Sequence, residues 1–194
     1  MPTRPLPTVS RCPAGACAVV VALLIATIAV LAGQGVALAD VSPPGDIPDN
    51  QAFVTYRGAG FSLKTPEGWV RTGSRSSVTF ADKYNRIAVE IRAAAAPTIA
   101  SATHQQVPQL AKTVKGFAAG TVTSVARASG RAILITYRAT SAPSAVTGKR
   151  VVNDVERYEF WRGGTLATLT LQAPRGSDNV DPWKLVTDSF RWIT

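Results

Sequence analysis

The sequence has 194 residues, with 21 Lys and Arg against 12 Asp and Glu and a formal net charge of +9 at pH 7. This length allows one domain with a sizeable hydrophobic core behind a leader segment. The basic residues are scattered, with no run longer than Lys149–Arg150, so they do not form a nucleic-acid-binding tract. Both cysteines, Cys12 and Cys17, precede the region expected to fold, so cysteine chemistry and disulfides are excluded from the domain.

The N-terminal segment has the pattern of a secretory signal. Arg4 and Arg11 precede an uncharged apolar run over Cys17–Ala32, and Ala37–Ala39 offers small residues at both positions that a signal peptidase reads. A basic start, an apolar middle and an Ala-x-Ala exit predict export. We therefore assign residues 1–39 as a signal peptide and expect the rest of the protein outside the cytoplasm, in the cell envelope or secreted.

The same segment is also compatible with an uncleaved membrane anchor. The uncharged stretch Ala14–Ala39 is long enough to cross a bilayer as a helix, which takes ~20 apolar residues. Leu31–Gly33 looks like the start of a bacterial lipobox, but Gln34 stands where the lipidated cysteine would be. We therefore expect either release or a peptide anchor, and no lipid.

Residues 40–51 are rich in proline and acids without periodicity, which predicts a linker before a globular domain over residues 52–194. The first half of that domain reads as strands. Phe61, Leu63 and Thr65 alternate with polar residues, the period of a half-buried strand. The expected strands in this half are 52–57, 61–66, and a hairpin of 76–82 with 86–92.

An amphipathic helix should follow. From Val107 to Ala118 the apolar residues recur at a spacing of three and four, which gives one buried stripe. Pro108 is expected in the first turn, because deeper in the helix it would remove a hydrogen bond and clash. Gly120 is expected to end the helix.

The second half of the domain again favours strands. The expected strands are 121–127 and 132–140, the second covered on both faces because it is almost continuously apolar, then a hairpin of 152–161 with 165–173 around Gly163–Gly164. A closing helix should begin with Asp181 as its N-cap and Pro182 in its first turn. Its buried stripe is expected to consist of Trp183, Val186, Phe190 and Ile193.

These elements predict an α/β (α+β) domain with a mostly antiparallel sheet and two main covering helices. Four segments also resemble exported actinobacterial proteins of the PsbP-like class, to which LpqN-type lipoproteins belong: GDIPDNQAFVTY, FSLKTPEGW, SVTFADKYN with RIAVEIR, and DPWKLVTDSFRW. The resemblance runs over Ala52–Trp192. It implies an α/β/α sandwich and a non-enzymatic accessory or binding role at the cell envelope.

No set of residues predicts catalysis, a cofactor or a metal. His104 is the only histidine, and no nucleophile turn accompanies it. Asp154, Glu156 and Glu159 could hold Ca²⁺ or act as an acid and base. Ion pairing across strands with Arg150, Arg157 and Arg162 is the preferred interpretation, because these arginines alternate with the acids.

A partner-binding surface is the remaining candidate. Arg71, Arg75, Lys83 and Arg86 fall in two connections that should lie near each other, which would form a basic patch for an anionic partner. Trp161 neighbours the Gly163–Gly164 turn and is expected to be exposed. Trp69 and Trp183 are interpreted as core residues.

Together these features predict an exported, non-enzymatic accessory protein that binds an envelope protein or an anionic membrane surface, without nucleic acid, metal or cofactor. The alternative is a carrier that holds a lipid or another apolar ligand between helix and sheet. An interaction protein should have a filled core and a charged or aromatic patch, whereas a carrier needs an apolar cavity.

Overall fold

The computed structural model describes residues 45–144 and 146–194, so the expected signal peptide and the first part of the linker lie outside the described residues. Within that part of the chain, no helix is long and apolar enough to cross a membrane. Of the expected linker, residues 45–51 pack against the domain. The Ile47 side chain is buried, and the backbone N–H of Ile47 donates to the side-chain oxygen Oδ1 of Asn179 at 2.7 Å.

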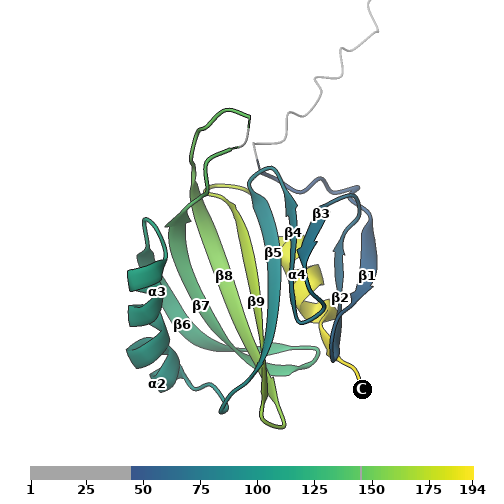
Figure 1. The fold of residues 1–194 in the computed structure, drawn as a ribbon, viewed down its shortest axis with the longest axis vertical. Coiled ribbons are helices and arrows are strands. Elements are labelled where there is room, and N and C mark those ends of the chain that lie inside the picture. The colour runs from purple at the N-terminus through teal and green to yellow at the C-terminus, as the bar shows by residue number, and fades with distance from the viewer. Residues whose placement is uncertain (1–44, 145) are drawn as a thin grey trace, which may run out of the picture. The chain divides into compact units, whose positions relative to one another are not determined.

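Seven strands form one antiparallel sheet, which is the centre of the domain (Figure 1). Each strand pairs with its neighbour in antiparallel register, and the strands nearest in sequence form hairpins. The order across the sheet is β3 (Val70–Gly73), β4 (Ser77–Asp82), β5 (Asn85–Ala93), β9 (Thr165–Pro174), β8 (Val152–Arg162), β7 (Gly130–Thr140) and β6 (Ala118–Arg127).

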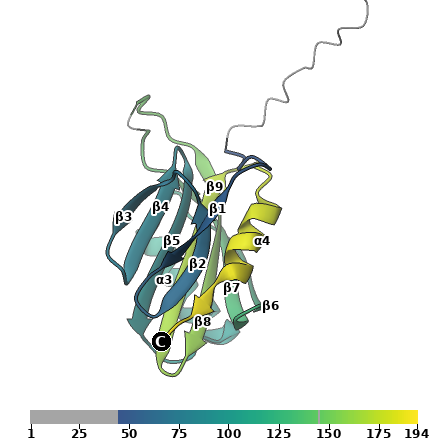
Figure 2. The same ribbon diagram turned by 90° about the vertical axis from the view of Figure 1, so that its right-hand side faces the viewer.

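A second, three-stranded sheet and one helix cover one side of the large sheet (Figure 2). The small sheet has the order β1 (Phe53–Arg57), β2 (Phe61–Pro66) and β10 (Arg191–Trp192), and the helix is α4 (Val180–Ser189). A second helical stretch, from α2 (Ile99–Ser101) through the π-helical turns η2 (Ala102–Gln106) to α3 (Val107–Thr113), lies against the other side.

The main core lies between the large sheet and the layer of β1, β2, β10 and α4. Alternate residues of the strands point into it, and we call this side of the large sheet the core-side face. Phe190, at the end of α4, is fully buried and stacks on Phe160 with ring centroids 4.6 Å apart. Phe61 lies on the other side of Phe190, at 6.1 Å. These three rings come from β2, the end of α4 and β8, and their stacking fixes α4 against both sheets.

A smaller cluster lies on the opposite side, which we call the helix-side face. Ile133, Ile135 and Tyr137 of β7 are buried there, and Leu110 of α3 packs on them. Phe117, just after the helix, contacts Tyr137 with ring centroids 5.4 Å apart. Strand β7 therefore has side chains covered on both faces, as its apolar sequence predicts.

The first helix begins and ends earlier than its periodicity indicates. Thr98 and Ser101 form a capping box, which starts the helix at Ile99. Pro108 lies in the first turn of α3, as predicted, but the continuous helical segment starts earlier, because α2 and the π-helical turns of η2 precede Val107. Such wide turns accommodate a residue without an N–H in a continuing helix. The predicted end at Gly120 is wrong, because Val114 is already extended (φ −93°, ψ 121°).

The closing helix also differs at both ends from its predicted bounds. Asn179, and not Asp181, is the N-cap residue. Its side-chain NH2 donates a hydrogen bond to the backbone carbonyl of Gly45, in the segment before β1, at 3.0 Å. The helix ends at Ser189, so Ile193 lies beyond it. The expected mixed α/β (α+β) fold, with mostly antiparallel sheets and two covering helical segments, is confirmed.

Candidate functional site

The four residues of the predicted basic patch do not come together. Arg75 lies in the β3–β4 turn and Lys83 in the β4–β5 turn, at opposite ends of β4. A strand of six residues is roughly 20 Å long. The expectation that the two connections lie near each other is therefore wrong, because consecutive hairpin turns alternate between the two ends of a sheet.

The other two residues of that patch lie on opposite faces of the sheet. Arg71 is paired with the buried Phe80, and its guanidinium lies 5.8 Å from the centroid of the Tyr56 ring on the core-side face. Arg86 is paired with Ala81 on the helix-side face, where it donates to the hydroxyl of Thr79 at 3.1 Å. All four side chains are exposed, but only Arg86 lies on the helix-side face of a strand.

On the helix-side face, exposed side chains lie along β5 and at the end of β8, whereas Thr168 of β9 and Glu159 of β8 are buried there. The strand register places Arg86 and Arg92 of β5 and Arg157 and Trp161 of β8 on this face, with Glu90 between the first two. Arg86, Glu90 and Arg92 are exposed. Trp161 is also exposed, as predicted, with 40% of its surface accessible. We call these five residues the open face.

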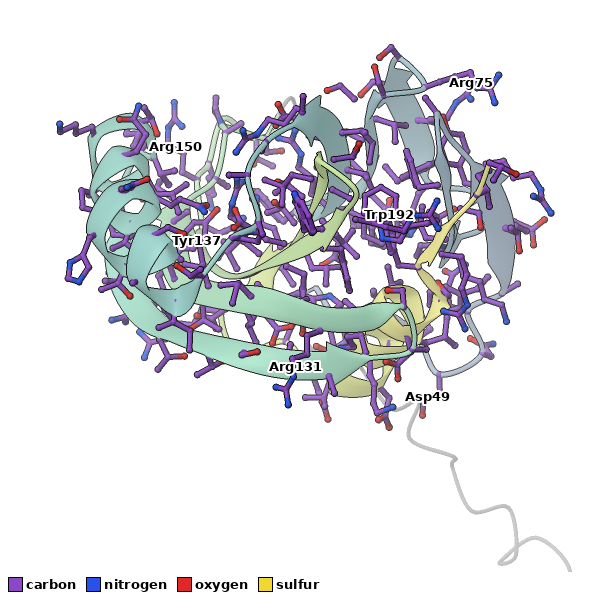
Figure 3. All side chains as sticks on the ribbon, turned by 90° about the horizontal axis from the view of Figure 1, so that it is seen from below. Asp49, Arg75, Arg131, Tyr137, Arg150 and Trp192 are labelled. Atoms are coloured by element: carbon purple, nitrogen blue, oxygen red, sulfur yellow. The ribbon has the colours of Figure 1, made fainter. Side chains whose placement is uncertain are left out.

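The helical segment packs on Tyr137 of β7, beside the strands that carry the open face (Figure 3). The link between them is Glu159, which is buried, accepts a hydrogen bond from the Gln106 side chain at 2.7 Å and pairs with Arg157 at 3.5 Å. Arg157 and Glu159 are neighbours on one strand, so this ion pair is not the cross-strand pair that the sequence suggests. Burial raises the pKa of Tyr137, and the positive charges of Arg157 and Arg86 oppose this to a smaller extent.

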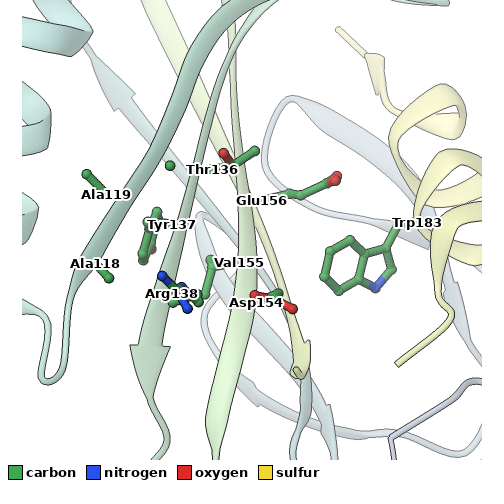
Figure 4. A pocket seen from close by; sticks show the side chains of 10 residues that line it. Ala118, Ala119, Thr136, Tyr137, Arg138, Asp154, Val155, Glu156 and Trp183 are labelled. Carbon is green, nitrogen blue, oxygen red and sulfur yellow. The ribbon is translucent and has the colours of Figure 1, made fainter. Parts of the chain in front are cut away.

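On the other face of the same sheet, a hollow of about 350 Å³ opens over β6, β7 and β8 (Figure 4). Three small residues, Ala118–Gly120, line it from the edge strand. A bulge follows them, since the register shifts between Ala119 and Val122. A Cβ on Gly120 would collide with Thr136, so this position admits only glycine without rearrangement. The hollow therefore exists because the edge strand has almost no side chains at this end.

The remaining walls of the hollow carry charge and one aromatic ring. Asp154 and Glu156 project from β8, Arg138 from β7, and Trp183 from the first turn of α4. Asp154 and Arg138 are opposite each other in the register. Within the described residues, however, neither side chain takes part in a hydrogen bond or an ion pair. Trp183 also packs against the main core, as predicted.

Glu156 is fixed in the hollow by a partly buried chain of hydrogen bonds. The Tyr158 hydroxyl donates to its carboxylate at 2.6 Å, and Arg127 donates to the Tyr158 oxygen at 2.9 Å. Arg127 is anchored in turn by the Thr187 hydroxyl of α4 at 3.0 Å. Burial, followed by the hydrogen bond to Glu156, raises the pKa of Tyr158 far above its ordinary value, so the phenol stays protonated and a donor.

In the part of the chain that the structure describes, His104 is exposed on the helical segment and has no ion pair with a carboxylate. In the described part of the chain, no group of three or more His, Cys, Asp or Glu side chains could hold a metal ion. The hollow and the open face can bind and orient charged groups.

No family model and no curated protein matches the sequence. Among solved structures, the cyanobacterial PsbP protein CyanoP of Synechocystis sp. PCC 6803 is similar with a TM-score of 0.50 at 14% identity, over 79% of this chain and 99% of that one. LpqN of Mycobacterium tuberculosis, described as involved in cell envelope biogenesis, gives a TM-score of 0.42 at 14% identity, over 78% and 90%.

A protein of Bacteroides thetaiotaomicron VPI-5482 gives a TM-score of 0.46 at 11% identity, and this chain spans about half of its length, 48%. The similarity to CyanoP shows that the domain has a PsbP-like fold. It shows the fold alone, so the function has to be argued from the open face and the hollow.

Proposed function

We propose that the protein is an exported, non-catalytic accessory protein of the cell envelope that binds an acidic partner protein through its open face. The observation that carries this proposal is the open face itself: Arg86, Arg92 and Trp161 are exposed on one face of the sheet, and the partly buried Arg157 lies on the same face. Export is supported by the basic, apolar and Ala-x-Ala pattern of residues 1–39.

The chemistry of the open face suits carboxylates. Arginine binds carboxylates with two parallel hydrogen bonds, and tryptophan and arginine are the residues that contribute most at protein interfaces. Arg157 is already paired with Glu159, so Arg86 and Arg92 are the groups free to meet a partner. The excess of basic residues in the whole chain would also speed the encounter with an acidic surface.

A partner protein fits this face better than a flat membrane. The helical segment packs on β7, on the same side of the sheet as the open face. A planar surface would therefore meet the helix as well as the arginines. A protein with a convex acidic surface could contact both. The alternative function, an apolar ligand held between helix and sheet, is not favoured, because Leu110, Val114 and Phe117 already pack on Ile135 and Tyr137 there.

The test is a titration with a defined acidic probe, a peptide of ten glutamates, compared with vesicles of anionic lipid. The double variant Arg86→Glu with Arg92→Glu should weaken peptide binding about fivefold or more, and 0.5 M salt should do the same. The matched control is Arg71→Glu, which reverses an exposed charge on the opposite face and should have a much smaller effect.

Equal losses in the double variant and in Arg71→Glu, each measured per charge, would contradict the open face as the binding surface. Stronger binding to anionic vesicles than to the peptide, lost in the same double variant, would keep the face but replace the protein partner with a membrane.

A further inference from the structure

We infer that the hollow beside Trp183 is a second binding site, independent of the open face, and that it takes an alkylammonium group. It lies on the core-side face of the large sheet, whereas the open face is on the other side. The ligand could be the side chain of a lysine in a partner or a free amine, because both present the same group.

The first reason is the local charge. Asp154 and Glu156 contribute two carboxylates to a space that holds one guanidinium, that of Arg138. Glu156 is hydrogen-bonded to the neutral phenol of Tyr158, and Asp154 has no polar partner within the described residues. The hollow is therefore acidic in a protein whose overall charge is +9, and a cation would complete its charge balance.

The second reason is the shape and the aromatic wall. A volume of about 350 Å³ lies at the small end of the range of ligand pockets, ~300–1,000 Å³. The ring of Trp183 forms one side of this space (Figure 4). Cations are attracted to the face of an indole, and an ammonium can at the same time donate hydrogen bonds to carboxylate oxygens.

The third reason is the rigidity of the acceptor. Glu156 is held through Tyr158 and Arg127 to Thr187, in the last turns of α4. Trp183 belongs to the same helix. The carboxylate and the indole are thus attached to one partly buried, hydrogen-bonded framework, so little side-chain entropy is lost when a ligand is placed between them.

The charge of Arg138 predicts the direction in which the affinity for an amine changes when this charge is removed. Its guanidinium repels an ammonium in the hollow but would attract the carboxylate of an anionic or zwitterionic ligand. Removing this charge should therefore strengthen the binding of a simple amine. The same change should weaken the binding of any ligand that the hollow recognises by a negative group.

The experiment follows the indole N–H resonance of Trp183 by NMR during titration with Nα-acetyl-lysine amide and, separately, with cadaverine. Trp183→Phe assigns the resonance among the four tryptophans. Asp154→Asn and Glu156→Gln should each weaken binding about tenfold, and Arg138→Gln should tighten it about twofold to fivefold. Ala118→Leu should block the site without changing charge.

Two controls separate this site from the open face. Glu90→Gln removes an exposed carboxylate from the other face and should leave amine binding unchanged. Arg86→Glu should weaken binding of the acidic peptide but not of the amines. Tighter binding of the lysine derivative would indicate a partner's side chain as the source, and tighter binding of cadaverine a free amine.

The inference is overturned if neither amine shifts the Trp183 resonance at 50 mM (about the weakest affinity worth calling a site). It is also overturned if the carboxylate variants bind as the parent does, or if Arg138→Gln weakens binding. The thermal unfolding of each variant is measured as well. A variant that unfolds at the same temperature as the parent is folded, so a change in its binding reports on the site.

Discussion

The two faces of the seven-stranded sheet are covered to different extents. The core-side face meets a complete second layer, in which Phe61, Phe160 and Phe190 stack and are almost entirely shielded from solvent. The helix-side face meets one helical segment, whose Val107 and Leu110 are only partly buried, and beyond that segment arginines face solvent. The first face holds the fold together, whereas the second leaves surface free for binding.

The hollow shows what happens where the complete layer stops. Strand β6 has only small residues at Ala118–Gly120, and Trp183 in the first turn of α4 lines the opposite side, so the described residues leave a hollow between them. Charged groups occupy this uncovered end, since Arg138 and Asp154 replace the apolar residues found further along β7 and β8. Both candidate surfaces are thus places where the layers leave the same sheet exposed.

The largest effect should separate the two cores. Phe190→Ala removes a fully buried ring and should lower the free energy of unfolding by ~3–5 kcal/mol, whereas Leu110→Ala, at a half-buried position, should cost ~1–2 kcal/mol. Urea denaturation of the two variants measures the difference. Equal losses would show that the helix-side cluster is as important to stability as the main core.

An intermediate effect is expected for the hydrogen-bond chain beneath the hollow. Tyr158→Phe removes the donor to Glu156 and the acceptor for Arg127, and should cost about 1–3 kcal/mol at pH 7. Because folding raises the pKa of Tyr158, the folded protein resists its ionisation. The parent should therefore lose stability above about pH 10, where the tyrosine of the unfolded chain ionises. The difference in the free energy of unfolding between the parent and Tyr158→Phe should then become smaller.

Stability curves of both proteins between pH 7 and pH 11 test this expectation. A gap that stays constant to pH 11 would mean that Tyr158 ionises as readily in the folded protein as in the unfolded chain.

The smallest effect concerns the surface of α4. The hydrogen bond from Lys184, 2.6 Å long, lowers the pKa of Asp188, and the charge of Arg127 adds to this. Because the pKa of Asp188 is lower in the folded state, its ionised form stabilises the protein at pH values above the pKa of the unfolded chain. This stabilisation is lost as the pH falls below about 4. Asp188→Asn should therefore cost less than about 1 kcal/mol at pH 7 and still less at pH 3. A larger cost at pH 3 than at pH 7 would contradict this assignment.

Much of this fold could be predicted from the sequence, because most strands alternate or are continuously apolar. Strand β3 could not, since all four of its residues are exposed and none marks a buried face. The end of the first helix was missed because Phe117 continues the apolar spacing after the backbone has turned at Gly116, which has φ 65°. There the tertiary contact of Phe117 with Tyr137 produces the pattern that a longer helix would show.

The candidate sites were less predictable than the fold. The basic patch depended on which ends of the strands meet, and local sequence does not encode that. Arg86 and Trp161 were identified, but Arg92 and Arg157 join them only through the pairing of β5, β9 and β8. The small residues Ala118–Gly120, which lie opposite charged residues of β7 and β8, mark the hollow. The sequence does not reveal this, because the apolar spacing assigns Ala118–Gly120 to the end of a helix.

The central claim is that one sheet carries two separate binding surfaces of opposite charge preference. The most direct measurement is a pair of NMR titrations of the same ¹⁵N-labelled domain, one with the glutamate peptide and one with Nα-acetyl-lysine amide. The peptide should shift amides of β5 and β9 and the indole of Trp161, and the amine should shift β8 around Asp154–Glu156 and the indole of Trp183. If both ligands shift one common set of residues, or if the two sets are exchanged, the claim is contradicted.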